Sequence, residues 1–207
     1  EVIIRATRVE QNSSMAHTDL TKEQIESMNT GQDLPYLLNT QPSVVTTSDA
    51  GAGVGYTGIR VRGSDATRVN VTINGIPVND AESQGTYWVD MPDLASSVSS
   101  IQLQRGVGTS TNGAGAFGGS LNIQTESGIK PAYGEIIVSG GSFNTQRITA
   151  KAGTGLLNNH FQIETRMSRM MSDGYIDRAS SGLSSWYGSA GYYGKKLTLK
   201  EIGRAHV

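Results

Sequence analysis

Residues 113–123 read GAGAFGGSLNI, and this stretch decides between two different folds. Its first six residues satisfy G-x-G-x-x-G, the dinucleotide fingerprint, which needs a strand before it and a helix after it. The residues at 120–125 (SLNIQT) instead alternate between polar and apolar side chains, as a β-strand does. The stretch therefore predicts a glycine-rich turn that enters a strand, which excludes a phosphate-binding loop. The chain also contains no nucleophile elbow, Walker loop or H-E-x-x-H motif, so we expect no enzyme.

Further strands are predicted upstream of this stretch. Alternating apolar residues place them near 57–62, 68–73 and 100–105, and the strand at 120–125 completes the set. Thr21 and Gln24 form a capping box that begins a helix running to about residue 29, and Asp33 is placed to cap a second helix at 34–40. Residues 8–127 are therefore expected to form an α+β unit, a small mixed sheet with short helices.

The chain changes character near residue 128. Segments of about ten residues then alternate strictly, at 133–140, 147–152, 160–167 and 184–194, and a fifth begins near Leu197. Such segments, with aromatic residues near their ends, are typical of transmembrane β-barrels, but a soluble antiparallel sheet shows the same alternation. Four or five strands do not close a membrane barrel, since the smallest has about 8.

Composition narrows the function classes. The formal net charge is −1, which argues against a basic nucleic-acid-binding face, and it divides into −6 for residues 1–127 and +5 for 128–207. Cysteine is absent and the three histidines are far apart, so neither a disulfide framework nor a metal site is expected. Several carboxylates lie within 80–93, among them Asp93, and we interpret them as solvated loop residues.

Four motifs in fixed order carry a family resemblance. They are 57–63 (TGIRVRG), 71–77 (VTINGIP), 100–106 (SIQLQRG) and 113–123, and 37–44 (LLNTQPSV) precedes them. Together they resemble the plug domain of TonB-dependent outer-membrane receptors, the siderophore and cobalamin receptor family. Asn74 stands where the family usually has Asp, and Ser43 where it usually has Gly.

The resemblance implies a fold and a function. Residues 8–127 would be the plug, and 128–200 the first antiparallel strands of a 22-stranded transmembrane barrel that this chain does not close. The protein would be the N-terminal part of a receptor in the Gram-negative outer membrane, in contact with its lipid. It would take up a scarce nutrient, most often an iron–siderophore complex, without a cofactor. Its partner would be TonB with the inner-membrane ExbB–ExbD motor complex. The alternative is a soluble or secreted β-rich binding or adhesin module.

The resemblance also implies site residues. Val2, Ile3 and Ile4 would contact TonB within a possible TonB box or linker at 1–7, unless they form an ordinary first plug strand. Arg62 and Arg105 match arginines that pair with glutamates of the barrel wall, and the alternative is that they are polar residues of edge strands.

Cargo contacts are expected in the outward loops at 51–56 and 78–91. Gln84, Tyr87 and Trp88 are the candidates, because aromatic rings offer large contact area at low entropic cost. Packing of the two rings onto the plug is the alternative. No metal-binding residue is expected.

The two ends of the chain suggest a piece of a longer protein. The sequence opens at Glu1 with no basic and apolar leader. Residues 201–207 (EIGRAHV) break the alternation begun at 197–199 and match a translated sequencing adapter, so we expect this tail to be non-native.

Overall fold

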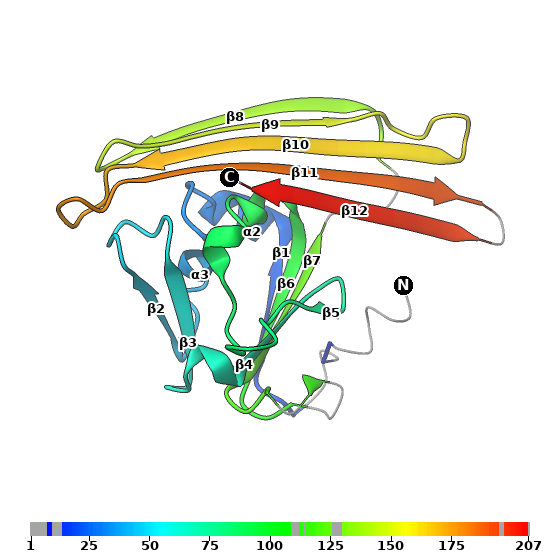
Figure 1. The fold of residues 1–207 in the computed structure, drawn as a ribbon. Coiled ribbons are helices and arrows are strands. Elements are labelled where there is room, and N and C mark those ends of the chain that lie inside the picture. The colour runs from blue at the N-terminus through cyan, green and yellow to red at the C-terminus, as the bar shows by residue number, and fades with distance from the viewer. Residues whose placement is uncertain are drawn as a thin grey trace.

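The computed structural model describes residues 8–9, 14–108, 112–113, 115–125, 130–194 and 197–206. It contains an N-terminal unit up to residue 125 and, above it in Figure 1, a sheet of long strands. The predicted boundary near residue 128 lies within 126–129, outside the described residues. None of the described helices is long and apolar enough to cross a membrane.

A five-stranded mixed sheet forms the centre of the N-terminal unit. Its strand order is β1-β6-β7-β4-β5, and only β4 and β7 run parallel to each other. The bounds are β1 His17–Thr21, β6 Val98–Arg105, β7 Gly119–Thr125, β4 Val69–Ile73 and β5 Ile76–Pro77. Alternate residues such as Ile101 and Leu103 are buried in the core, as the period-2 pattern predicts.

Short helices and 3₁₀ turns lie around the core of this unit. The helices are α2 Lys22–Met28 and α3 Leu34–Leu37, and the 3₁₀ turns are η1 Ala66–Arg68, η2 Trp88–Asp90 and η3 Leu94–Ser97. Helix α2 packs against β6 of the mixed sheet. The predicted capping box is present: Gln24 Oε1 accepts from the Thr21 main-chain N–H at 2.9 Å, and Thr21 Oγ1 accepts from the Gln24 N–H at 3.4 Å. The second helix is shorter than predicted. The carboxylate of Asp33 does not cap it but accepts from Thr57 Oγ1 at 3.0 Å.

One predicted strand lies in a different sheet. β3, Thr57–Val61, pairs with β2, Val44–Ser48, in a separate two-stranded sheet. The expectation that segment 57–62 joins the mixed sheet is therefore wrong. Alternation identifies a strand and its buried face, but tertiary packing decides which strand it pairs with.

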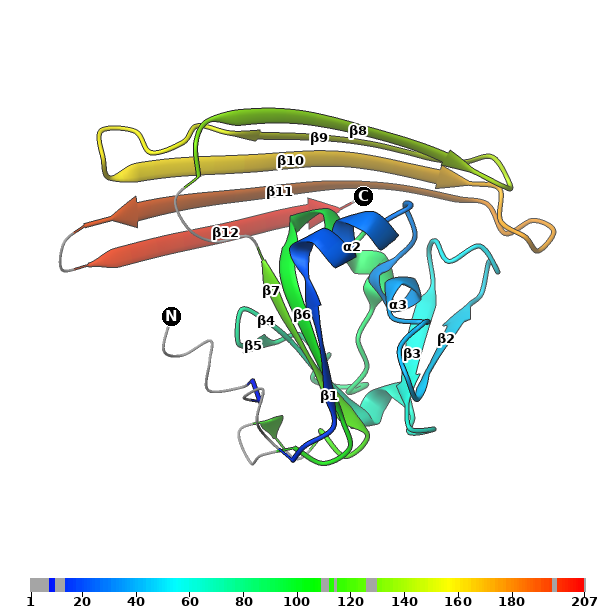
Figure 2. The same cartoon turned by 180° about the vertical axis from the view of Figure 1, so that it is seen from behind.

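The remaining strands form the outer sheet, an antiparallel meander in the order β12-β11-β10-β9-β8. The bounds are β8 Tyr133–Gly141, β9 Thr145–Gly153, β10 Phe161–Ser172, β11 Ser181–Tyr193 and β12 Thr198–His206. Figure 2 shows from behind that α2 lies directly beneath this sheet. Each strand overlaps a predicted amphipathic segment, although β9, β10 and β11 are longer than predicted and β12 continues to His206, through most of the predicted non-native tail.

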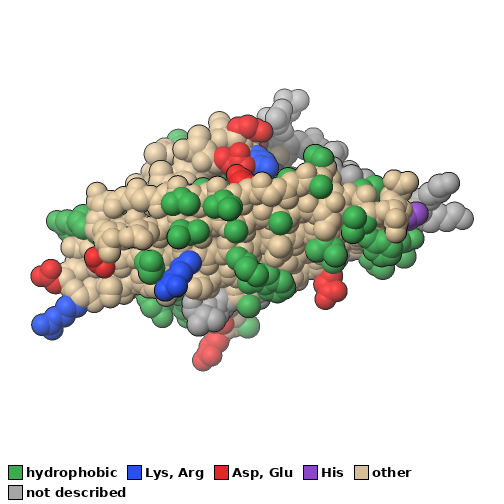
Figure 3. Space-filling view, turned by 90° about the horizontal axis from the view of Figure 1, so that it is seen from above, with side chains coloured by type: hydrophobic (Ala, Val, Ile, Leu, Met, Phe, Trp, Pro, Cys, Tyr) green, Lys and Arg blue, Asp and Glu red, His purple; other side chains and the backbone are tan. Residues whose placement is uncertain are grey.

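The apolar face of the outer sheet is turned away from the N-terminal unit. Ile136 is 76% exposed and Met167 is 62% exposed, and Figure 3 shows hydrophobic side chains spread over this face. The opposite face carries Arg147, Thr149 and Arg166, and all three are buried. A soluble sheet buries its apolar face against a core, whereas a membrane barrel presents it to lipid. This orientation favours the barrel interpretation over the adhesin alternative.

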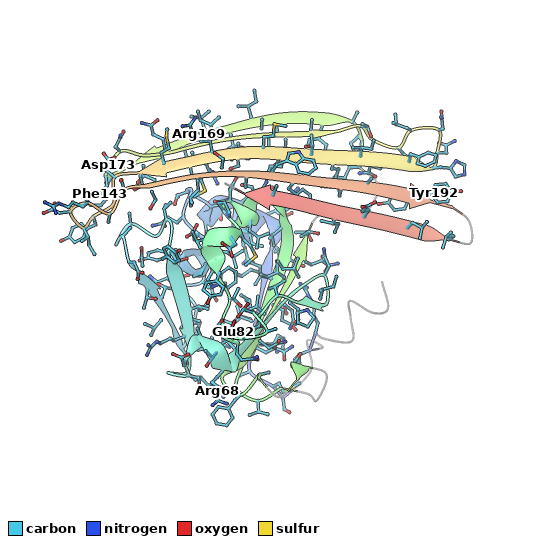
Figure 4. The ribbon with its side chains drawn as sticks, viewed as in Figure 1. Arg68, Glu82, Phe143, Arg169, Asp173 and Tyr192 are labelled. Carbon is cyan, nitrogen blue, oxygen red and sulfur yellow. The ribbon has the colours of Figure 1, made fainter. Side chains whose placement is uncertain are left out.

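Aromatic rings lie near both ends of the outer sheet. Phe143 meets Tyr175 edge to face at one end, with ring centroids 5.4 Å apart. Tyr192 contacts the rings of His160 and Phe161 at the other end. Figure 4 shows Phe143 and Tyr192 at these opposite ends. The arrangement agrees with aromatic girdles at two membrane interfaces.

The predicted tail lies in β12 and departs from the pattern of its neighbours. Glu201 pairs with Ala190 on the outer face, and Ile202 pairs with Ser189 on the inner face. Paired residues share a face, so the polar and apolar positions are reversed at residues 201 and 202 relative to β10 and β11, whereas Ala205, paired with Trp186, again lies on the outer face. That residues 201–207 are non-native stays a prediction.

Candidate functional site

The outer sheet and the N-terminal unit meet at a buried carboxylate, that of Asp93. Asp93 stands before η3 with φ of 53°, in the left-handed region, and is 3% exposed. Its Oδ1 accepts from Ser96 Oγ at 2.6 Å and from Arg147 Nη1 at 3.2 Å. Its Oδ2 accepts from Thr149 Oγ1 and Ser168 Oγ, each at 2.6 Å. Three of these four donors belong to β9 and β10, so the carboxylate binds the unit directly to the outer sheet.

Arg147 connects the same carboxylate to the end of α2. Its Nη1 donates to Asn29 Oδ1 at 2.6 Å, and its Nη2 donates to the Asn29 carbonyl at 3.0 Å. Its Nε donates to Ser139 Oγ on β8 at 3.1 Å. Asn29 is the C-cap of α2, where a cation also meets the negative end of the helix dipole. The planar guanidinium therefore donates hydrogen bonds to the end of the helix, to the Asp93 loop and to the neighbouring strand β8.

A second arginine and a serine hold the main chain of the same loop. Arg166 donates from Nη1 to the Asp93 carbonyl, and this nitrogen also lies 3.9 Å from Asp93 Oδ2. Its Nη2 donates to Ser185 Oγ at 3.3 Å, and that hydroxyl donates to the Pro92 carbonyl at 3.0 Å. The loop at 92–93 is thus fixed through both its side chain and its carbonyls.

Electrostatics explain why this contact is specific. A buried carboxylate must be paired and hydrogen-bonded, because desolvation of an isolated ion costs several kcal/mol. Asp93 meets that condition only when β9 and β10 are in place. Residues 1–127 have a negative net charge and residues 128–207 a positive one, which agrees with this local pairing of an acidic plug-side loop with basic residues of the outer sheet. We call the set Asn29, Asp93, Ser96, Arg147, Thr149, Arg166, Ser168 and Ser185 the Asp93 cluster.

Comparison with known proteins identifies the family. The family model described as the TonB-dependent Receptor Plug Domain matches residues 9–120, more than half of the chain. The chain belongs to this family. Its N-terminal unit is a plug, and the expected fold class is confirmed.

Relatives extend the match to the outer sheet. The probable TonB-dependent siderophore receptor PirA of Acinetobacter baumannii is 24% identical over 146 residues, which is 66% of this chain and 19% of the relative. The crystal structure of PirA has a TM-score of 0.72 at 17% identity, and it covers 92% of this chain and 31% of its own. The structure of P. aeruginosa FpvA bound to heterologous pyoverdines has a TM-score of 0.77 at 14% identity, and the match covers 97% of this chain and 26% of FpvA. The copper transporter OprC has a TM-score of 0.70 at 16% identity, and the match covers 96% of this chain and 32% of OprC. The chain therefore spans about a fifth of the curated relative, and the structural likenesses establish the fold.

The plug arginines singled out from the sequence do not belong to the Asp93 cluster. Arg105 donates to Thr18 Oγ1 at 2.6 Å and to the His17 carbonyl at 3.2 Å, so it braces β1. Arg62 is exposed, with φ of 53°, and its guanidinium lies beside Gly106. Their pairing with barrel glutamates stays a prediction.

The Asp93 cluster was missed by sequence reasoning. Asp93 was interpreted as a solvated loop residue, as Glu82 is, and the structure shows that this interpretation is wrong for Asp93. The opposite charges of the two parts of the chain were the signal that could have found it.

The candidate cargo residues separate into a buried one and two exposed ones. Trp88 is 3% exposed and packs in the plug core, which favours the packing alternative for this ring, and its contact with cargo stays a prediction. Tyr87 is 49% exposed, and its hydroxyl donates to Ser83 Oγ at 3.2 Å. Gln84 is exposed and donates to the Ala81 carbonyl at 2.8 Å. The proposed TonB contacts Val2, Ile3 and Ile4 lie outside the described residues.

The glycine-rich loop at 51–56 meets the connection between β10 and β11. The Tyr175 main-chain N–H donates to the Ala50 carbonyl at 2.8 Å, and a Cβ on Gly51 would lie 3.0 Å from Tyr175 Cβ. Asp33 lies beneath this loop, where its N–H donates to the Gly53 carbonyl at 2.8 Å. Burial raises the pKa of Asp33 to about 7, although hydrogen bonds from Thr57 and Gly55 act in the opposite direction.

Proposed function

We propose that this chain is the N-terminal part of a TonB-dependent outer-membrane receptor, and that the scarce nutrient it imports is an iron–siderophore complex. One observation carries the proposal: a plug unit is bound by the Asp93 cluster to the polar face of a sheet whose other face is apolar and exposed. Such a sheet suits a barrel wall with lipid outside and a filled lumen inside. A soluble adhesin module would leave that apolar face in water.

The names of relatives support the cargo class. PirA is described as a probable siderophore receptor, and FpvA is described in complex with pyoverdines. OprC, described as a copper transporter, has the same fold, so the fold alone does not select the cargo. The siderophore proposal therefore rests on PirA, which matches this chain in sequence as well as in fold.

The proposed transport cycle uses binding and conformational change without covalent chemistry. Val2, Ile3 and Ile4 would add as a strand to TonB, with main-chain hydrogen bonds giving affinity. The ExbB–ExbD motor complex would then pull on the plug from the inner membrane. Cargo bound outside would raise the exposure of this segment, which is coupling between two sites. Gln84 and Tyr87 remain the proposed cargo contacts, and Arg62 and Arg105 the proposed plug–barrel lock.

The test is iron uptake by cells that carry the full-length receptor. Labelled iron bound to a panel of siderophores is supplied to matched strains with and without TonB. Uptake of at least one siderophore that requires both the receptor and TonB would support the proposal. Equal uptake with and without the receptor for every siderophore, with the receptor present in the outer membrane, would remove the siderophore assignment.

A further inference from the structure

Residues 8 and 9 lie across the face of the mixed sheet that is opposite the apolar core. The main-chain N–H of Val9 donates to Gln102 Oε1 at 2.7 Å, and Gln102 Nε2 donates to the Val9 carbonyl at 3.0 Å. One side-chain amide thus satisfies both main-chain polar groups of one residue, as a neighbouring strand would. Val9 and Gln102 are both buried, and 93 residues separate them in sequence.

Arg8, the preceding residue, adds further hydrogen bonds to the sheet. Arg8 Nη2 donates to the Ser100 carbonyl of β6 at 3.2 Å and to the Asn122 carbonyl of β7 at 3.1 Å. Gln102 Nε2 also donates to Asp19 Oδ1 of β1 at 2.8 Å. Residues 8 and 9 are therefore hydrogen-bonded to the interior of the sheet by side chains, whereas β1 is held by a full main-chain ladder.

The surface beneath residues 8 and 9 is polar as well as buried. Gln104 Nε2 donates to Gln102 Oε1 at 3.0 Å, and Asn112 Nδ2 donates to Gln104 Oε1 at 2.8 Å. On the neighbouring strands, Thr72 Oγ1 donates to Asn122 Oδ1 at 2.8 Å. Buried amides and hydroxyls need hydrogen-bond partners, and water can supply these once the cover is removed. An apolar face could not be wetted at comparably small cost.

The two attachments of the plug differ in kind. The Asp93 cluster fixes one side to the outer sheet through a multiply bonded carboxylate and two guanidinium groups. Residues 8 and 9 are held by neutral amide hydrogen bonds and one arginine. Hydrogen bonds to charged groups are roughly twice as strong as neutral ones. A pull on the N-terminal side would therefore break the Gln102 contact before the Asp93 cluster.

We propose that Gln102 is the positioning residue that holds residues 8 and 9 on the plug, and that release of Val9 exposes the buried side-chain amide of Gln102 to water. The inference deepens the proposed function, since the segment ahead of Val9 is the one proposed to bind TonB.

The test measures release of residue 9 without cargo or TonB. Val9→Cys keeps the main-chain groups that Gln102 binds, and this chain has no other cysteine. The full-length receptor, otherwise free of cysteine, is labelled with a water-soluble maleimide in outer membranes from a strain lacking TonB. Gln102→Met should raise the labelling rate roughly 10- to 30-fold, as loss of two hydrogen bonds of ordinary net strength implies. The matched control is Thr72→Val, which removes a buried hydroxyl bond on the same face without touching Val9, and its rate should stay within twofold.

Two outcomes overturn the proposal. One is equal labelling of the Gln102→Met and parent receptors. The other is an amide hydrogen of Val9 that exchanges in the unmodified receptor as fast as in an unfolded peptide, a measurement that does not depend on variant assembly. Gln102→Glu, which keeps one acceptor but removes the amide donor, is the second variant if Gln102→Met does not reach the membrane. These experiments do not measure uptake, so a negative labelling result would not contradict the transport proposal. A negative uptake result would likewise not contradict the role of Gln102.

Discussion

Arg147 of β9 donates to the buried carboxylate of Asp93 at 3.2 Å, and this contact joins the plug to the barrel wall. The acidic partner belongs to the plug and the basic partner to the wall, the reverse of the lock expected for Arg62 and Arg105. Both side chains are at most 4% exposed, so neither charge can be solvated if the other is lost. The pair therefore determines where the plug rests against the first strands of the wall.

Removal of the charge of Asp93 should loosen the plug. Asp93→Asn keeps the side-chain volume but removes the carboxylate that pairs with the buried guanidinium of Arg147, and loss of a buried partner costs about 3–5 kcal/mol. The expected result is a lower urea midpoint for plug unfolding in the purified full-length receptor, followed by protease accessibility. Glu82→Gln is the control, because Glu82 is exposed and lies well away from the outer sheet in Figure 4. Equal midpoints for the two variants would contradict the assigned role of Asp93.

The pairing itself can be isolated with a double-mutant cycle. Arg147→Met should destabilise the receptor on its own, because Asp93 and the Asn29 carbonyl lose a donor. Once Asp93→Asn has removed the charge, the same change should cost less, with a coupling energy of about 0.5–3 kcal/mol. The cycle is measured by the same urea titration. Additive effects of the two changes would show that the two residues act independently.

Local structure was predictable to a greater extent than the contact between the two units. The Thr21–Gln24 capping box and the strand alternation depend on neighbours close in sequence, and both predictions were confirmed. The pairing of β3 with β2 and the burial of Asp93 depend on segments far apart in the chain. Donors from β9 and β10 surround Asp93, and no spacing rule in the sequence connects them to it. The burial of Trp88 could not be predicted, because an aromatic residue in a loop has the same sequence pattern whether it faces solvent or the core.

The stability of the plug should depend on pH through Asp33. Burial raises the pKa of its carboxyl to about 7, while the unfolded carboxyl titrates near 3.8. Between these values the folded state holds a proton that the unfolded state has released, so stability falls as pH rises from about 4 to 7. Asp33→Asn keeps an acceptor for Thr57 but cannot ionise, so the stability of the variant should not show this fall with rising pH. The test is the melting temperature of the parent and of the Asp33→Asn variant at pH 5 and pH 8. The change seen in the variant is subtracted from the change seen in the parent. A corrected parent melting temperature that is no lower at pH 8 than at pH 5 would contradict the prediction.

The exposed apolar face should tolerate charge only near its ends. Ile136→Lys places an ammonium group on the outer face of β8, where a midplane charge costs about 2–4 kcal/mol in lipid. Gln146→Lys is the control, since residue 146 is exposed near a strand end, where the cost falls to about 0–1 kcal/mol. Folding yield into lipid vesicles should drop for the first variant alone. Equal yields would favour a soluble sheet over a barrel wall.

The loop at 78–91 allows cargo contact to be separated from plug packing, because its two aromatic neighbours differ in burial. Tyr87→Ala removes an exposed ring and should weaken siderophore binding by the full-length receptor about tenfold, with melting temperature unchanged. Trp88→Ala removes a buried ring and should destabilise the plug by about 3–5 kcal/mol, with the affinity of the folded fraction unchanged. Binding is measured by titration with the siderophore that the uptake assay identifies, and folding by heating the same samples. If Tyr87→Ala binds within twofold of the parent, Tyr87 is not a cargo contact. If Trp88→Ala instead loses affinity at full stability, the ring reaches cargo in a conformation other than this one.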